Sequence, residues 1–218
     1  MKHPFRRSRI SPISRVSALG PGLMLALLLS ACASKAPSPM LYDFGPLPAL
    51  PARAQDGSES SAPTPPLVLF DLTGPAWLEN QKMAYRLVYA EPQQTRFYAY
   101  SQWNATPLQL LGARLKSRFA QAGVAVLPDL ASAANACMLR MEVDEFSQQF
   151  DTPERSSGHL ALRASLFLQH RLIAQKNFAS TTNANSGDAI GGAKALAAAA
   201  DAIASELISW IKSVPAAP

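Results

Sequence analysis

Two stretches in which apolar and polar residues alternate strictly constrain the fold of this chain more than any other feature. In the first, Cys137, Leu139, Met141 and Val143 alternate with Arg140, Glu142 and Asp144. In the second, Leu160 to Leu168 alternate with polar residues in the same way. A period of two predicts strands with one buried and one solvated face. Turn formers in 151–158 join the two stretches, and 171–180 completes a predicted antiparallel meander.

Two amphipathic helices flank this meander in the sequence. The first begins with Thr106 as N-cap and Pro107 at the first helical position, and it stops at Gly123. The second covers 189–212 after the N-cap Asp188, with apolar residues along one stripe. The expected fold class is therefore α+β, an antiparallel β-sheet with two amphipathic helices packed on one face in a single domain.

The polar faces of both helices leave alternatives open. On the first helix, Arg114 and Arg118 lie among other basic and amide side chains, so this face is either solvated or in contact with anionic lipid; a solvated face is the expectation. On the second helix, Asp201 lies opposite the apolar stripe. That helix is expected to pack on the sheet rather than on a membrane or a partner.

Shorter strands are expected at 67–70, 83–89, 96–103 and 124–127, with a turn at Glu91 and Pro92. Six of the 17 aromatic residues lie between Tyr85 and Trp103. Aromatic residues favour half-buried sheet surfaces, so core packing is the main prediction for them. A weaker hypothesis makes Tyr98, Tyr100 and Trp103 part of a surface that contacts a partner or lipid.

The N-terminus has the pattern of a bacterial lipoprotein signal. Basic residues precede an apolar run of about 12 residues, short of the ~20 that span a bilayer. The motif Leu29-Ser30-Ala31-Cys32 follows and resembles the lipobox, in which the cysteine is lipidated and becomes the first residue. An ordinary signal peptide followed by an incidental cysteine is the alternative. We predict lipidation, including palmitate, at Cys32.

The charge distribution excludes a nucleic-acid-binding function. The chain has a formal charge of +5, but residues 1–31 contain five of its 20 Lys and Arg and none of its 15 acidic residues. The part after the signal is therefore formally neutral, whereas binding to phosphate backbones needs positive charge on the folded domain.

The expected organisation has three parts. Residues 1–31 form the signal peptide, and 32–40 form the lipidated cysteine and a short tether. Residues 41–218 form the domain, which carries a Pro-rich insert at about 47–66 and in which 41–44 is a candidate edge strand.

No catalytic residues, cofactor site or metal site are predicted. The sequence lacks a Gly-rich phosphate loop and the HExxH, GxSxG and CxxC motifs. His159 and His170 flank a predicted strand, where solvent exposure is the simpler explanation. Cys137 is expected to be a buried thiol, with an intermolecular disulfide as the alternative.

Together, several segments resemble the ABC-type transport auxiliary lipoproteins, which include PqiC-like proteins. These segments are the lipobox, Leu41-Tyr42-Asp43-Phe44, Trp77-Leu78, Met83-Ala84-Tyr85-Arg86, and Tyr98 to Trp103 leading into the helix that starts at Pro107. The resemblance implies an outer-membrane lipoprotein on the periplasmic face. Its partners would be an MCE-family periplasmic protein and an inner-membrane ABC permease and ATPase that move phospholipid or other apolar molecules.

From this resemblance we expect a non-enzymatic auxiliary component. Whether it forms a homo-oligomer is left open. The alternative is a free-standing periplasmic lipoprotein that binds lipid or a small molecule. A cell-envelope hydrolase ranks lowest because no nucleophile and base pair is evident in the sequence.

Overall fold

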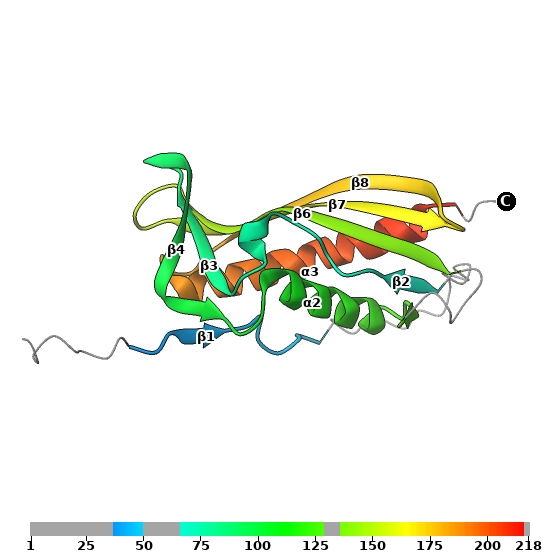
Figure 1. Cartoon of the computed structure of the whole chain (residues 1–218), viewed down its shortest axis with the longest axis horizontal. Coiled ribbons are helices and arrows are strands. Elements are labelled where there is room, and N and C mark those ends of the chain that lie inside the picture. Colours follow the sequence, from blue (N-terminus) through cyan, green and yellow to red (C-terminus); the bar gives the residue numbers. More distant parts are fainter. Residues whose placement is uncertain (1–36, 50–65, 129–135, 216–218) are drawn as a thin grey trace, which may run out of the picture. The chain divides into compact units, whose positions relative to one another are not determined.

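The alternating stretches form the long strands of the sheet, as predicted (Figure 1). Strands β6 (Cys137–Phe150) and β7 (Ser156–Leu168) pair antiparallel along their whole length, and β8 (Arg171–Asn183) pairs antiparallel with β7. The computed structural model describes residues 37–49, 66–128 and 136–215. The described residues from 38 onward form one compact unit. Cys32, the signal peptide and most of the Pro-rich insert lie outside the described residues.

The opposite edge of β6 is shared by two short strands that run parallel to it. Strand β2 (Leu67–Leu69) pairs with the start of β6, and β3 (Lys82–Leu87) pairs with its end. Strand β5 (Val126–Leu127) continues the sheet beside β2. Parallel pairing needs a long crossover, which helix α2 supplies on the way from β4 to β6. The α+β class is confirmed, while the sheet is mixed rather than wholly antiparallel.

The hairpin of β3 and β4 (Glu91–Trp103) turns earlier than expected. Its turn is at Val88 to Ala90, where the Ala90 amide donates to the Leu87 carbonyl at 3.0 Å. Glu91 and Pro92, predicted to form the turn, begin β4 instead. Proline is tolerated at this position because it is close to the end of the strand, where a missing amide donor costs little.

The edge strand predicted at 41–44 is present as β1 (Met40–Tyr42), which pairs parallel with the end of β4. Phe44, two residues after β1, lies in the core. The centre of its ring lies 5.6 Å from that of Trp103, in an edge-on arrangement, and 5.8 Å from that of Phe146. These three rings are buried. They fix the N-terminal segment of the domain to strands β4 and β6.

Both helices begin where the sequence predicts. The Thr106 hydroxyl accepts from the Gln109 amide at 3.3 Å at the start of α2 (Pro107–Gln121), and the Gln109 side chain accepts from the Thr106 amide in return. Gly123 takes a φ of +74° after the helix, a conformation that favours glycine. Asp188 caps α3 (Ala189–Ser213) by accepting from the Gly191 amide at 2.8 Å.

Helix α3 packs on β6, β7 and β8, and α2 lies against α3 (Figure 1). The helix and the sheet approach closely at Gly158 of β7, where a Cβ atom would lie 2.7 Å from the Leu196 amide nitrogen. The alanines of α3 make this contact possible, since small side chains let the helix backbone approach the sheet. A short 3₁₀ helix, η2 (Ala76–Leu78), completes the described elements. No helix in the described ranges combines the length and apolarity that crossing a bilayer requires.

Candidate binding surfaces

The three aromatic residues singled out in the sequence occupy different environments. Trp103 is 1% exposed in the core, so it has no surface to offer to a partner, and that part of the hypothesis is wrong. Tyr98 is half-buried and donates its hydroxyl to Gln148 Oε1 at 2.8 Å. Burial raises the pKa of Tyr98 above its usual value, and Tyr85 and Asp188 add to the effect. Tyr100, at 58% exposed, is the one of the three that lies on the surface.

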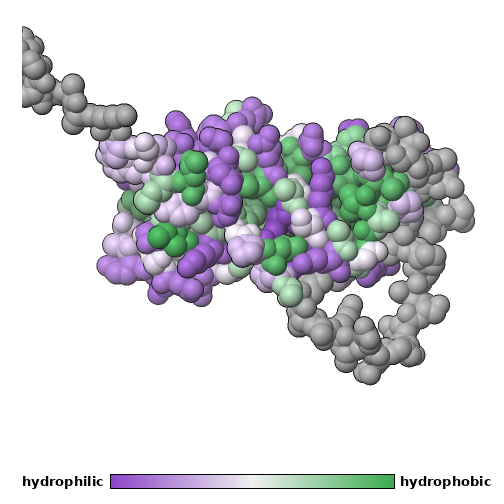
Figure 2. Space-filling view, turned by 90° about the horizontal axis from the view of Figure 1, so that it is seen from below, coloured by the Kyte–Doolittle hydropathy of each residue, from purple (hydrophilic) through white to green (hydrophobic). Residues whose placement is uncertain are grey.

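Tyr100 has apolar neighbours on the edge strand β1. Leu41 is 62% exposed and pairs with Gln102. Because Gln102 and Tyr100 are two residues apart in β4, Leu41 and Tyr100 project from the same face of the sheet. Met40 is exposed as well, but it pairs with Ser101 and therefore projects from the opposite face. We call Leu41 and Tyr100 the β1 edge patch. On the face of the molecule in Figure 2, hydrophobic residues form separate patches divided by hydrophilic ones, which is ordinary for a protein surface.

A buried ionic cluster joins the two helices. The guanidinium of Arg114 donates to both carboxylate oxygens of Asp201, from Nε at 2.7 Å and from Nη2 at 2.8 Å. Arg118 donates to the same carboxylate, from Nε to Oδ1 at 2.7 Å and from Nη2 to Oδ2 at 2.6 Å. Both arginines are 7% exposed. The solvated helix face expected from the sequence is therefore wrong at these two positions.

The remaining donors of this cluster hold the segment after β1. Arg114 Nη1 donates to the Gly45 carbonyl at 3.3 Å, and Arg118 Nη1 donates to the Pro48 carbonyl at 3.0 Å. Burial acts to raise the pKa of Asp201, but hydrogen bonds from Arg118 and Arg114 outweigh it and lower that pKa below its usual value. The cluster thus stays ionised and ties α2, α3 and the N-terminal segment together.

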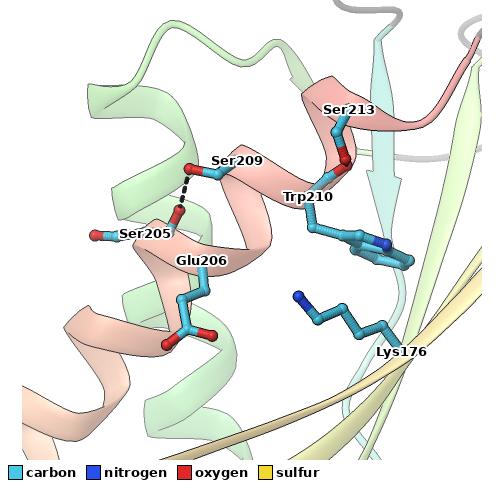
Figure 3. Close-up of a pocket in the computed structure, with 6 residues that line it drawn as sticks. All are labelled: Lys176, Ser205, Glu206, Ser209, Trp210 and Ser213. Carbon is cyan, nitrogen blue, oxygen red and sulfur yellow. Dashed lines mark hydrogen bonds between the residues drawn. The ribbon is translucent and has the colours of Figure 1, made fainter.

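A hollow of about 450 Å³ lies between α3 and the outer strand β8 (Figure 3). Lys176 reaches into it from β8, and Glu206 and Trp210 face it from the helix, along with three serines. The Lys176 ammonium lies 5.0 Å from the centre of the Phe178 ring, which packs edge-on against Trp210. The hollow is open and lined by polar and apolar groups, so it suits a surface contact better than an enclosed small molecule.

A second hollow, of about 400 Å³, lies on the sheet face away from α3. It is formed where the chain after β2 runs along one edge of β6, whose other edge pairs with β7. Its lining includes Phe70, Asp71 and Thr73 from that segment, Arg140, Met141 and Glu142 from β6, and Arg163 and Ser165 from β7. Neither hollow has a motif in the sequence. The first joins one residue of β8 to the C-terminal part of α3, and the second joins the chain after β2 to β6 and β7, which are far from it in the sequence.

Among the described residues, His159 contacts two hydroxyl groups. His159 Nε2 lies 3.0 Å from Ser157 Oγ, and its Nδ1 lies 3.3 Å from Thr181 Oγ1. A catalytic pair would need a third group, usually a carboxylate, to orient the imidazole, and here a hydroxyl takes that place. Glu145 instead binds Arg86 at 3.2 Å. His159 lies within β7 and is half-buried rather than at a solvated strand end.

The part of the chain that the structure describes contains no group of three or more His, Cys, Asp or Glu side chains placed to hold a metal ion. Cys137 is buried and unpaired with any described cysteine. Burial raises the pKa of its thiol, which keeps the thiol protonated and unreactive. The buried-thiol expectation is confirmed.

Solved structures show the same fold. Protein XCC0632 of Xanthomonas campestris, of family DUF330, is 17% identical, with a TM-score of 0.60 over 71% of this chain and 88% of that one. A second crystal structure, of an uncharacterised protein, is 16% identical, with a TM-score of 0.61 over 80% of this chain and 99% of that one. A comparison with curated protein sequences finds no match.

The family model for the ABC-type transport auxiliary lipoprotein component matches residues 47–208. This range begins in the segment held by Arg118 and ends near the end of α3, so it includes β2 to β8 and both helices. The match agrees with the order of elements that the sequence motifs predict. The chain belongs to the family of ABC-type transport auxiliary lipoprotein components.

Proposed function

We propose that this auxiliary lipoprotein is anchored in the outer membrane through Cys32 and faces the periplasm. It works without catalysis beside an MCE-family periplasmic protein and an inner-membrane ABC permease and ATPase. Together these proteins move phospholipid or other apolar molecules across the cell envelope. The membership of the chain in the auxiliary lipoprotein family is the observation that carries this proposal.

The position of β1 supports an anchored domain that works close to its membrane. Met40 begins β1 eight positions after Cys32 in the sequence. A tether of that length reaches at most about 30 Å when extended. Lipidation with two or more acyl chains gives stable attachment. The β1 edge patch, at the end of this tether, then lies within reach of the bilayer surface and of any partner that approaches it.

We assign partner contact to the β1 edge patch. Among the described strands, β1 pairs with β4 alone, so within that part of the chain its other side presents backbone groups without a strand partner. An extended segment of a partner could add to this edge, with Leu41 and Tyr100 giving apolar contacts. The three-residue length of β1 limits such pairing to a few hydrogen bonds, which fits a contact that forms and releases.

Copurification from mild detergent tests the partnership. The full-length lipoprotein is expected to retain an MCE protein, and the double variant L41E/Y100E is expected to lose it. The matched control is Ile190→Glu, which changes an exposed apolar residue on α3. Absence of any MCE protein with the unaltered lipoprotein would contradict the partnership. Equal retention by the double variant would contradict the assignment to the β1 edge patch.

Metabolic labelling tests the anchor. Cys32→Ser is expected to abolish palmitate incorporation and to release the protein from the outer membrane fraction. Cys137→Ser is the control, since the thiol of Cys137 is buried and protonated. Palmitate that persists in Cys32→Ser would show that Cys32 is not the lipidated residue.

The alternative, a free-standing binder that encloses lipid between the sheet and the helices, meets a steric obstacle. At Gly158 the backbones of β7 and α3 are in contact, which leaves no room for an acyl chain there. Native mass spectrometry distinguishes the two functions. A lipid bound without any partner protein would favour the free-standing binder.

A further inference from the structure

The hollow on the sheet face away from α3 contains an arginine that is held in place but has no acidic partner among the described residues. The Arg140 guanidinium carbon lies 4.8 Å from the centre of the Phe70 ring and 5.8 Å from that of Phe167. Both distances are within the range of cation–π attraction. Arg140 is exposed, and the two rings contact its guanidinium while no described group pairs with its donors toward the hollow. An arginine that recognises an oxyanion has donors available in this way.

Two hydroxyl groups and a second guanidinium lie in the same hollow. Arg140 on β6 is paired with Ser165 on β7, and the next pair on the same face of the sheet is Glu142 with Arg163. Arg163 binds Glu142 in an exposed ion pair, so these two charges neutralise one another. The Thr73 hydroxyl faces the hollow and is 3.5 Å from the Met141 carbonyl, a weak contact that a better acceptor would replace.

An acid completes the lining. The chain makes an irregular bend between Phe70 and Thr73, because the amides of these residues bind the carbonyls of Leu139 and Met141 while Leu72 turns into the core. Asp71, at this bend, is exposed and lines the hollow, and no described cation lies within ion-pair distance of it. After the Arg163 and Glu142 pair is set aside, the hollow holds one unpaired cation and one unpaired anion.

We propose that this hollow binds a zwitterionic phosphate ester that carries an ammonium group. The phosphate oxygens accept from Arg140 and from the hydroxyls of Thr73 and Ser165, and the ammonium donates to Asp71. Several donors from three chain segments suit a tetrahedral oxyanion better than a planar carboxylate. Asp71 disfavours inorganic phosphate by repulsion and favours an ester with a positive group. The proposal does not rest on a transport partner, so it and the proposed function fail separately.

Isothermal titration of the full-length protein in a maltoside detergent tests this site with O-phosphoethanolamine as the probe. Arg140→Gln is expected to weaken binding at least tenfold, since it removes the unpaired charge-assisted donors. Arg140→Lys keeps the charge but loses the planar guanidinium. Its affinity for O-phosphoethanolamine is expected to lie between those of the unaltered protein and Arg140→Gln. Asp71→Asn is expected to weaken the affinity for phosphoethanolamine and not the affinity for inorganic phosphate.

The control variant is Arg155→Gln, which removes the same charge from the β6–β7 turn at the other end of the hairpin. It is expected to bind like the unaltered protein. A second titration with dihexanoyl phosphatidylethanolamine distinguishes a lipid headgroup from a soluble ester: tighter binding of the lipid by tenfold or more indicates the headgroup, and equal binding indicates the soluble ester. No measurable binding of either probe, or equal binding by Arg140→Gln and Arg155→Gln, would overturn the proposal.

Discussion

The buried cluster of Arg114, Arg118 and Asp201 makes Asp201 the most informative single position for stability. Asp201→Ala would leave two guanidinium groups, each 7% exposed, without their carboxylate. Removing one partner of a buried ion pair costs 3–5 kcal/mol. Because the Asp201 side chain is 20% exposed, the lower end applies, about 3 kcal/mol. For a protein of this size that corresponds to a fall in Tm of roughly 6–12 °C.

Urea denaturation followed by circular dichroism measures this loss, and Glu142→Ala is the matched control. Glu142 also binds an arginine, Arg163, but those two side chains are 53% and 43% exposed. An exposed pair contributes less than about 1 kcal/mol. If Asp201→Ala lowers the free energy of unfolding no more than Glu142→Ala does, the cluster does not stabilise the fold and the interpretation is refuted.

The pH dependence gives the same cluster a second signature. Arginine hydrogen bonds lower the pKa of Asp201 below its ordinary value of 3.8, despite the opposing effect of burial. A lowered folded-state pKa stabilises the fold above pH 3.8, and this contribution is lost as the pH falls through the folded-state value. The unfolding free energies of the unaltered protein and Asp201→Asn are therefore expected to converge in acid. If the unfolding free energies of the two proteins differ by the same amount at pH 7 and at pH 3, the Asp201 carboxylate does not stabilise the fold in its ionised form.

Three further predictions concern other parts of the domain. Gly158→Ala places a Cβ 2.7 Å from the backbone of Leu196, so we expect a loss of about 1–3 kcal/mol in urea denaturation, and an unchanged midpoint would refute the close packing of α3. Thr106→Ala removes the hydroxyl that accepts from the Gln109 amide, and we expect it to lower the free energy of unfolding by about 1 kcal/mol and with it the Tm. Thr106→Ser keeps a hydroxyl at this position and is expected to leave the Tm unchanged. Burial lowers the pKa of His159 below 6.5, although Glu145 and Asp151 partly oppose this, so stability is expected to fall as the pH drops below 6.5. In unfolding measured between pH 7 and pH 5, His159→Gln is expected to remove this dependence of stability on pH. The same pH dependence in the variant and the unaltered protein would show that His159 is not its source.

Local signals predicted the regular elements well. Thr106 and Pro107 mark the start of α2, and the alternation from Cys137 to Val143 marks the start of β6, because capping and strand periodicity depend on neighbouring residues. The turn before β4 comes earlier than predicted, since Glu91 and Pro92 favour turns locally while the pairing of β3 with β4 fixes the actual turn at 88–90.

The sites were much less accessible to sequence reasoning. Arg114 and Arg118 have the spacing of a solvated helix face, and their partner Asp201 is 87 and 83 residues away. Nothing local distinguishes a buried arginine from an exposed one in that pattern. For Trp103, the main prediction of core packing is confirmed and the weaker surface hypothesis is wrong, because β1 and Phe44, which come from a separate segment, lie against that end of β4.

The parallel pairing of β1 with β4 determines how the domain would bear a load. A pull on the chain before residue 37, such as an anchor at Cys32 would exert, is transmitted first to the three paired positions of β1. Behind them, the ring of Phe44 and the two arginine contacts to Gly45 and Pro48 resist extension before any strand of the meander is strained. The first segment to yield under tension would then be β1. Its release would lengthen the tether while β6, β7 and α3 stay folded.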